Sequence, residues 1–153
     1  MPTLLCSGDR VMRELVIPQK IFDAMLDYCR TTAPNEACGI LGGKEGAVSA
    51  IYRMSNTENS PVSYFMDSQE QFKALKDMRG RGLSMAGIFH SHPASSAYPS
   101  AKDVNLAFYE DAAYVIVGLA AEQPDVKAFS IRRGEIVEID IVVKGESSRT
   151  CRD

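Results

Sequence analysis

The stretch Leu83-Ser-Met-Ala-Gly-Ile-Phe-His-Ser-His-Pro93 decides how this chain folds and what chemistry it can carry. Its apolar run predicts a buried strand over 83–89, which leads directly into the only two histidines of the 153 residues. Side chains two positions apart point to the same side of a strand, so His90 and His92 present both imidazoles to one side. Pro93 cannot donate to a sheet ladder and ends the strand there. The pair indicates either a metal site or simply two polar residues at a strand end.

Ser100 and Asp103 follow at a short distance and add a carboxylate to the two imidazoles. The pattern S-x-x-D is typical of a helix N-terminus, and capping alone explains it without any function. A capped first turn is nevertheless a rigid mount for a metal ligand. Two histidines and one carboxylate leave a zinc ion with one open coordination position, which is the catalytic rather than the structural pattern.

Glu36 is the candidate for a remote partner, a carboxylate that would work on water held by the metal. It follows Pro34 and Asn35 at the entrance of a glycine-containing strand expected over 35–43. A glutamate at a strand entrance is ordinarily just solvated. Spacing along the chain does not bring it to the histidines, so both interpretations stay open at this point.

Apolar periodicity, interrupted by glycine and proline, predicts about seven strands and three helices. The expected strands cover 15–17, 35–43, 47–54, 83–89, 114–119, 126–131 and 135–142, with a further short one at 63–66. The expected helices cover 18–32, then 68–80 with a capping box of Ser68 and Gln71, and a third from Ser100 with Val104, Ala107 and Phe108 on one face. These elements indicate a single α/β domain over 13–142, with a mixed central sheet flanked by the three helices. Residues 1–12 are expected to form an N-terminal arm and 143–153 a polar C-terminal tail.

Composition and charge argue against several classes of partner. The net charge of −3 and the pI near 5.4 do not provide the concentrated basic surface that binds a nucleic-acid backbone. No run approaches the ~20 apolar residues that a membrane helix needs. The first ten residues become too polar after Leu5 for a secretory signal. We therefore expect a cytoplasmic protein that binds neither nucleic acid nor membrane.

The four cysteines, Cys6, Cys29, Cys38 and Cys151, include no C-x-x-C pair. Their spacing fits neither a disulfide framework nor a structural zinc knuckle. Cys29 and Cys38 stand in apolar surroundings, where a free cysteine behaves as a small buried hydrophobe. A catalytic cysteine is the weaker alternative, because both histidines are already engaged as candidate ligands.

Taken together, Glu36 and the run His90-Ser91-His92-Pro93, six residues, Ser100, two residues and Asp103 resemble the motif E…H-[ST]-H-P-x6-S-x-x-D of the JAMM (MPN-plus) metalloproteases. Two flanks agree as well. The segment 34–42 is similar to the P-x-E-x-C-G-x-L-x-G segment of bacterial members, and 98–100 is similar to the end of their metal loop. The resemblance extends over about 13–142 and implies a cytidine-deaminase-like MPN domain.

The resemblance also implies a role for each motif residue. His90, His92 and Asp103 would hold one zinc ion, with a water as the fourth ligand. Glu36 would act as general base toward that water and pass the proton to the leaving amine. Ser100 would donate a hydrogen bond to the tetrahedral oxyanion. The implied reaction is hydrolysis of an amide or isopeptide bond without a covalent intermediate.

The family's substrates are ubiquitin-like proteins cleaved after a C-terminal Gly-Gly, and compact bacterial members act on small sulfur carriers of ubiquitin fold. Only nine residues separate Asp103 from the strand expected near 113, so the long insertion of dedicated deubiquitinases is not expected here. We therefore expect a sulfur-carrier or small ubiquitin-like protein as partner. Its tail would bind as an added strand at an exposed edge near 47–54. The sequence does not indicate an oligomeric state.

Two alternatives remain at this stage. A zinc deaminase would need a glutamate two residues after its histidine and a P-C-x-x-C pair, and the sequence has neither. A non-catalytic module would grip a ubiquitin-like partner and use zinc only to hold its loop. Such a module would need neither Glu36 nor Ser100, so their presence favours the enzyme.

Overall fold

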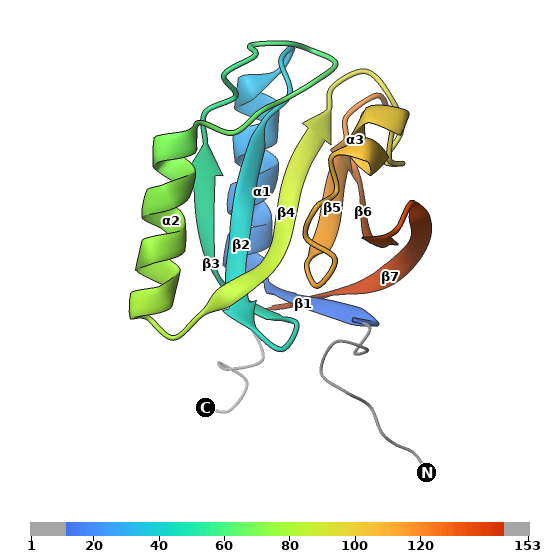
Figure 1. Cartoon of the computed structure of the whole chain (residues 1–153). Helices are drawn as coiled ribbons and strands as arrows, with labels where there is room; N and C mark the ends of the chain where they lie inside the picture. Colours follow the sequence, from blue (N-terminus) through green and yellow to red (C-terminus); the bar gives the residue numbers. More distant parts are fainter. Residues whose placement is uncertain (1–11, 146–153) are drawn as a thin grey trace.

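The structure is a computed structural model that describes residues 12–145, and its seven strands form one mixed sheet with helices on both faces (Figure 1). The strands are β1 (Glu14–Pro18), β2 (Cys38–Lys44), β3 (Ala47–Met54), β4 (Ser84–His92), β5 (Ala113–Gly118), β6 (Asp125–Arg132) and β7 (Glu135–Lys144). The helices are α1 (Gln19–Thr32), α2 (Ser68–Gly80) and α3 (Ala101–Asn105). The predicted α/β class, the mixed sheet and the three helices are confirmed. The predicted arm and tail lie outside the described residues, apart from the few next to the domain.

The strand order is β1-β3-β2-β4-β5-β6-β7, and the sheet closes into a barrel because β1 also pairs with β7. Most neighbouring strands are antiparallel, whereas β4 and β5 run parallel, as do both pairings of β1. The two pairings that close the barrel through β1 differ in length. β1 pairs with β7 over five residues but with β3 at the single position Val16–Ala47. The sequence did not predict this closure.

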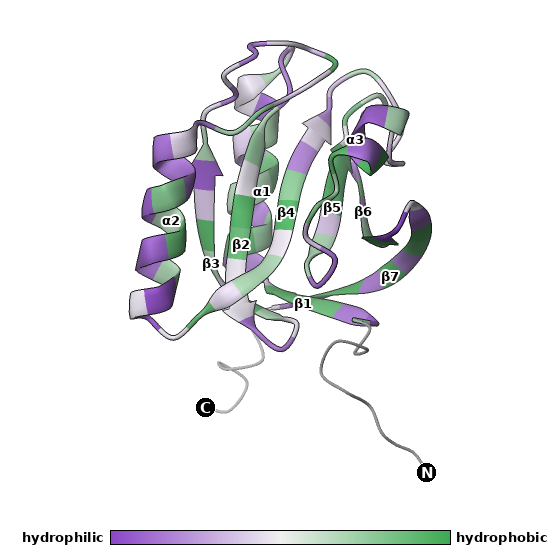
Figure 2. Cartoon of the chain, viewed as in Figure 1, coloured by the Kyte–Doolittle hydropathy of each residue, from purple (hydrophilic) through white to green (hydrophobic). Residues whose placement is uncertain are grey.

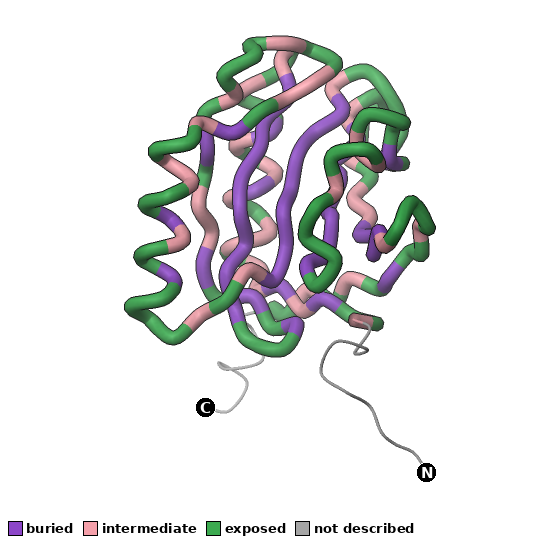
Figure 3. Tube along the Cα trace, viewed as in Figure 1, coloured by how far each residue is buried: buried purple, intermediate pink, exposed green. Residues whose placement is uncertain are grey.

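β4 is the central strand that carries both histidines, and it lies between β2 and β5. The register sets Cys38 opposite His90 and Gly118 opposite His92. Every residue of β4 from Ala86 to His92 is buried, and Figure 3 shows β2 and β4 as continuous buried traces. The strand ends at His92, as the following proline predicted.

The sheet has an apolar layer on each face, and in Figure 2 the apolar colour follows the strands while the helices also carry polar residues. One layer packs under α1, with Met25 and Cys29 fully buried against the sheet. The other packs under α2, with Ala74 and Met78 as its buried helix residues. The strand β4, whose end carries the two histidines, thus has apolar packing on both faces of the sheet.

Helix α2 begins one residue earlier than its predicted capping box allows. Asp67 is the N-cap, and its carboxylate accepts a hydrogen bond from the backbone N–H of Glu70 at 3.0 Å. The predicted pairing of Ser68 with Gln71 is therefore wrong. An aspartate at this position satisfies an unpaired N–H and also complements the positive end of the helix, so it is the stronger cap.

Two predicted elements differ from the structure. The segment 63–66 is not a strand, because Met66 makes only an isolated bridge to Asn56. The third helix is short and ends at Asn105, and Phe108 is 73% exposed rather than on a buried helix face. Val104 and Ala107 do pack against the core layer under α2, as their spacing predicted.

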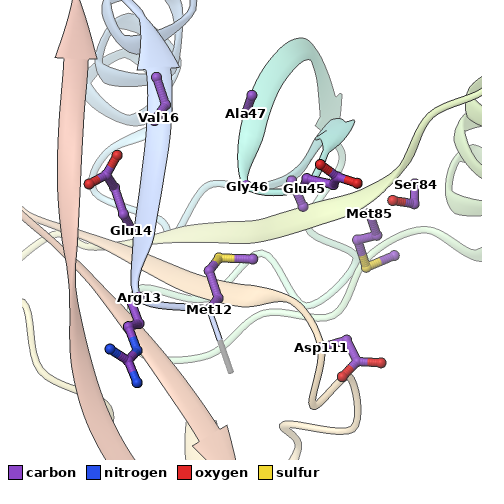
Figure 4. A pocket seen from close by; sticks show the side chains of 11 residues that line it. Met12, Arg13, Glu14, Val16, Glu45, Gly46, Ala47, Ser84, Met85 and Asp111 are labelled. Atoms are coloured by element: carbon purple, nitrogen blue, oxygen red, sulfur yellow. The ribbon is translucent and has the colours of Figure 1, made fainter. Parts of the chain in front are cut away.

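A pocket of about 790 Å³ lies at the opposite end of β4 from the histidines (Figure 4). It is lined by the start of β1, the β2–β3 turn at Glu45 and Gly46, and the first residues of β4. Among the described residues no group of metal-ligating side chains lies there, since the one such group is elsewhere. No described helix is both long and apolar enough to cross a membrane.

Candidate active site

The structure brings His90, His92 and Asp103 together at the end of β4. The Nε2 atoms of the two histidines are 3.2 Å apart, and the Asp103 Oδ2 lies 3.2 Å from His90 Nε2 and 3.1 Å from His92 Nε2. Both imidazoles are buried, and the Asp103 side chain is 13% exposed. Three potential ligand atoms therefore meet at one point in a nearly enclosed position.

The hydrogen-bond polarity of this cluster favours a cation at its centre. The Ser96 carbonyl can only accept, so the His92 Nδ1, 2.8 Å away, must carry the hydrogen. If His92 is neutral, the lone pair of its Nε2 then faces the Asp103 carboxylate, which is also an acceptor. A single proton can relieve one contact between two acceptors, whereas a metal cation can bind the two Nε2 atoms and the Asp103 Oδ2 together. Metal-ligating histidines commonly donate their other ring N–H in this way.

The size of the triangle also fits a metal. Zinc binds imidazole nitrogen and carboxylate oxygen at about 2.0–2.1 Å in tetrahedral geometry, which separates neighbouring ligand atoms by about 3.3 Å. The three edges here are 3.1, 3.2 and 3.2 Å. The donor set and its spacing therefore suit a tetrahedral divalent ion with one ligand position left over.

The N-terminus of α3 mounts the carboxylate. Ser100 Oγ accepts a hydrogen bond from the Asp103 N–H at 3.1 Å, and the Ser100 N–H donates to Asp103 Oδ2 at 2.9 Å. This reciprocal capping box confirms the predicted helix start at Ser100. Burial acts to raise the pKa of the Asp103 carboxyl, but hydrogen bonds that the imidazoles donate in the metal-free protein outweigh it and hold the pKa well below the usual range. Asp103 is consequently an anion at any physiological pH.

A glycine lets the loop after His92 fold close to the sheet. A Cβ on Gly118 would lie 2.9 Å from the backbone nitrogen of Ala97, closer than real Cβ atoms approach, and 3.2 Å from the Ser95 carbonyl oxygen, which is tighter than most real contacts. Gly118 pairs with His92 in the register, so the loop returns directly over the histidine strand. This close approach places the Ser96 carbonyl where it meets the His92 ring.

Glu36 lies beside the cluster although it is 54 residues from His90 in the chain. The backbone of Ala37 exchanges hydrogen bonds with Ser91, whose N–H donates to the Ala37 carbonyl and whose hydroxyl accepts the Ala37 N–H at 2.8 Å. Glu36 is only 4% exposed, and its Oε1 has no hydrogen-bond partner among the described residues. Burial raises the pKa of its carboxyl to about 7, and the charge of Asp103 adds to the rise while that of His92 opposes it. A carboxyl with this pKa can take up and release a proton at neutral pH.

Two residues near the site had no predicted role. Tyr64 stacks on the His90 imidazole with ring centroids 4.6 Å apart and an angle of 27° between the planes. The Asn56 side-chain amide donates to the carbonyl oxygens of Glu36 and Ser63, both at 3.0 Å. Asn56 stands in a polar connection and Tyr64 in the segment wrongly predicted as a strand, so nothing in their local sequence signals these contacts.

An apolar groove of about 250 Å³ leads away from the histidines along β4. Its floor includes Met85 and Ile88, which face the same way although they are three residues apart. The register shift opposite Leu41–Gly42 leaves Ala86 as an extra residue in β4, and such a bulge reverses the alternation. Ile88 precedes His90 by two residues, so the groove and the imidazoles share one face of the strand.

The walls of this groove come from two separate parts of the chain. Tyr64 and Gln71 stand on the side of α2, and Phe108 and Tyr109 follow α3 on the other side. Gln71 Nε2 donates to the Tyr109 hydroxyl at 3.3 Å, which links the two walls. The described residues that line the groove include no charged side chain. It therefore suits an uncharged, apolar segment of a bound molecule.

The buried cysteines take no part in this site's chemistry. Cys29 and Cys38 are both fully buried, as predicted. Burial raises the pKa of each thiol to about 12, so both are protonated at neutral pH and unsuited to nucleophilic attack. Cys6 and Cys151 lie outside the described residues.

Comparison with known proteins agrees with the fold and the site. Residues 18–132 match the family described as prokaryotic homologues of the JAB domain. The chain is 38% identical to the CysO-cysteine peptidase of Mycobacterium tuberculosis over 127 residues, which cover 81% of this chain and 87% of the relative. It is 36% identical to the desampylase of Pyrococcus furiosus over 131 residues, which cover 85% and 91%. A solution structure from Desulfitobacterium hafniense shares 42% identity and a TM-score of 0.79, over 86% of this chain and 94% of that one.

These similarities define the class, and the chain belongs to the prokaryotic branch of the JAMM/MPN family. It is a hydrolytic enzyme, a peptidase or isopeptidase of the JAMM type, as its named relatives are. The deaminase and the non-catalytic module considered from the sequence are thereby both disfavoured. The resemblance found in residues 34–103 is confirmed at the level of the family.

Proposed function

We propose that this chain is a zinc-dependent peptidase that hydrolyses the amide bond after the C-terminal Gly-Gly of a small ubiquitin-like or sulfur-carrier protein. The observation that carries the proposal is the meeting of three potential ligand atoms, from His90, His92 and Asp103, within 3.2 Å of one another. A divalent cation at their centre would satisfy all three together. Zinc suits this nitrogen- and oxygen-containing set, and the open ligand position is typical of catalytic sites.

In this proposal each remaining site residue has a role that its contacts allow. Bound zinc would supply Lewis acidity and lower the pKa of the attacking water toward neutrality. Glu36 would take a proton from that water at its unpartnered Oε1 and deliver it to the leaving amine, which its pKa near 7 favours. The Ser100 hydroxyl accepts the Asp103 N–H through a lone pair, so its own hydrogen remains available to donate to the oxyanion.

The relatives support a carrier protein as the substrate. One is named for a bond between CysO and cysteine, and the other is named a desampylase. Both names fit the cleavage of a ubiquitin-like or sulfur-carrier protein, and we infer that the C-terminal tail of such a protein enters the site. The apolar groove that begins at Tyr64 suits this tail, because it is uncharged and opens beside the site.

The edge of β3, where the sequence led us to expect the tail, stays a prediction. β3 pairs with β2 along its length and meets β1 only at Ala47, so most of its other edge has no strand partner. The Tyr28 hydroxyl, however, donates to the Met54 carbonyl at 2.6 Å at the end of this strand. The groove has the stronger support, because Tyr64 lines it and also contacts His90.

The test is hydrolysis of a Gly-Gly carrier that bears a C-terminal extension. Zinc-loaded protein should release the extension, and Glu36→Gln should lower kcat by about 100- to 10,000-fold while it retains zinc, because the variant cannot accept a proton. Two results would contradict the proposal: full activity of Glu36→Gln, or equal inertness of both proteins toward several carriers that the wild type nevertheless binds. The second result would indicate the non-catalytic binding module.

A further inference from the structure

The two histidines of the site are held in different ways. His92 donates from Nδ1 to the Ser96 carbonyl at 2.8 Å. His90 Nδ1 is buried and has no hydrogen-bond partner among the described residues. A metal-ligating histidine usually donates its second ring N–H to an acceptor, which fixes the orientation of the ring. The ring of His90 therefore lacks the restraint that its neighbour has.

A flat side chain covers His90 instead. The Tyr64 ring lies nearly parallel to the imidazole, with centroids 4.6 Å apart and 27° between the planes. The ring of His92 meets His90 at its edge, at 4.9 Å and 62°. A stacked ring resists rotation of the imidazole about its Cβ–Cγ bond, because that rotation would drive an edge into the neighbouring face. Tyr64 can thus supply by packing the orientation that a hydrogen bond supplies elsewhere.

Tyr64 is itself held from both sides by one amide. Asn56 Nδ2 donates to the carbonyl of Ser63 at 3.0 Å, and Asn56 Oδ1 accepts the N–H of Phe65 at 3.1 Å. The same Nδ2 donates to the Glu36 carbonyl at 3.0 Å. All three partners are backbone groups of fixed polarity, so only one orientation of the amide satisfies them. Asn56 therefore joins the residue that covers His90 to the backbone of Glu36.

We propose that Tyr64, held in place by Asn56, is a positioning residue that orients the His90 imidazole toward the metal. The inference rests on the metal site of the proposed function. It adds to that site two residues, Tyr64 and Asn56, that lie outside the family motif and hold His90 in position. The support comes from the connection between β3 and α2, 26 residues before His90 in the chain. It needs the planar ring and not the hydroxyl, since the stacked contact is made by the ring.

Metal affinity and ligand geometry test this inference without any measurement of activity. We would titrate wild type, Tyr64→Leu and Tyr64→Phe with zinc against a chromophoric chelator, and record the visible spectrum of each cobalt(II)-loaded protein. Tyr64→Leu should weaken zinc binding by about 10- to 100-fold, as loss of such supports typically does, and should change the cobalt spectrum. Tyr64→Phe should match the wild type. A matched control is Phe72→Leu, because Phe72 is exposed on α2 and lines neither the groove nor the site.

The possible outcomes separate this inference from the proposed function. Equal zinc affinity and equal spectra for wild type and Tyr64→Leu overturn the role of Tyr64 and leave the metal site intact. A wild type that binds no zinc overturns both. If Tyr64→Leu does not fold, Asn56→Ala serves instead, because it keeps the Tyr64 ring and removes its two flanking hydrogen bonds. It should then weaken zinc binding in the same direction, and unchanged affinity in that variant overturns the inference.

Discussion

Glu36 shows how the environment of a single residue prepares it for acid–base chemistry. Its carboxyl is 4% exposed, has an oxygen without a partner among the described residues, and has a pKa near 7 because burial disfavours its charge. Contact with water or an ion pair with a cation would have lowered the pKa of Glu36. No lysine or arginine among the described residues makes an ion pair with its carboxylate. The arrangement costs stability and leaves a carboxyl that can exchange a proton near neutral pH.

This cost predicts a pH-dependent difference between wild type and Glu36→Gln in the metal-free protein. Below about pH 4.5 the carboxyl is protonated in both folded and unfolded chains, so the difference should be near zero. As the pH rises toward 7, the unfolded chain loses its proton while the folded chain retains it, so the wild type alone loses stability. At pH 8 Glu36→Gln should be more stable by up to about 3 kcal/mol. Urea unfolding at pH 4 and pH 8 measures this, and a difference that is constant or larger at pH 4 would contradict it.

At the scale of elements, the site depends on three short segments that each place part of it. β4 presents both imidazoles, the capped start of α3 presents Asp103, and the loop between them supplies the carbonyl that orients His92. The tight return of this loop requires the missing side chain of Gly118. The strand end, the loop and the helix start therefore act as one unit.

Gly118→Ala tests this coupling between strand and loop. The added Cβ would lie 2.9 Å from a backbone atom of the loop, so the loop must shift and carry the Ser96 carbonyl away from His92. Zinc affinity should fall by about tenfold, in the range typical for a lost orienting contact. Gly80→Ala is the matched control, because no atom lies within 4 Å of its new Cβ. Unchanged zinc affinity in Gly118→Ala would show that the loop adapts without cost to the site.

The segment after α3 carries a second prediction at this scale. Phe108 is 73% exposed and forms one wall of the apolar groove, so its ring is available to cover a substrate tail. Phe108→Ala should raise KM by about 5- to 30-fold, which corresponds to roughly 1–2 kcal/mol of lost apolar contact, and should leave kcat nearly unchanged. Kinetics with a Gly-Gly carrier measure this effect. Phe72→Ala, which removes an equally exposed ring outside the groove, should not change KM. An effect of equal size in both variants would count against the groove.

At the scale of the whole molecule, the closed sheet brings distant parts of the chain to one end of β4. The metal-ligating candidates come from β4 and α3, Glu36 precedes β2, and the support formed by Asn56 and Tyr64 lies between β3 and α2. A metal bound here would link β4 to α3 only in the folded chain. Its binding should therefore add directly to the stability of the fold.

Metal removal tests this linkage. A ligand at about 100 times its Kd stabilises a folded protein by about 2.7 kcal/mol, which raises Tm by about 5–10 °C in a domain of this size. Zinc-loaded protein should therefore melt higher than EDTA-treated protein by that amount, and added zinc should restore the higher Tm. Asp103→Asn is the control, since it keeps the size of the side chain but weakens the ligand, and its Tm should respond little to zinc. An identical Tm with and without zinc in the wild type would contradict a site that joins two elements.

Local patterns were sufficient for most elements and for the metal-ligand candidates. His90 and His92 are two apart in an apolar strand, and Ser100 and Asp103 are three apart at a helix start, so periodicity and capping rules apply to each pair directly. The same rules failed where two caps competed at Asp67 and Ser68, and where the short apolar run in 63–66 has no strand partner. Local sequence does not decide between the two caps, because Asp67 and Ser68 each offer an acceptor three residues before a backbone N–H. It does not decide whether 63–66 forms a strand either, because strand pairing depends on residues elsewhere in the chain.

The amino-acid sequence by itself determined the α/β class, the histidine pair on the central strand and the capped carboxylate, because each depends on residues within one turn or one strand. The tertiary structure alone decided that Glu36 is buried beside the cluster, that Tyr64 covers His90, and that β1 closes the sheet. These features join residues 26 to more than 100 positions apart. They follow from strand order and register, which are set by how the whole core packs.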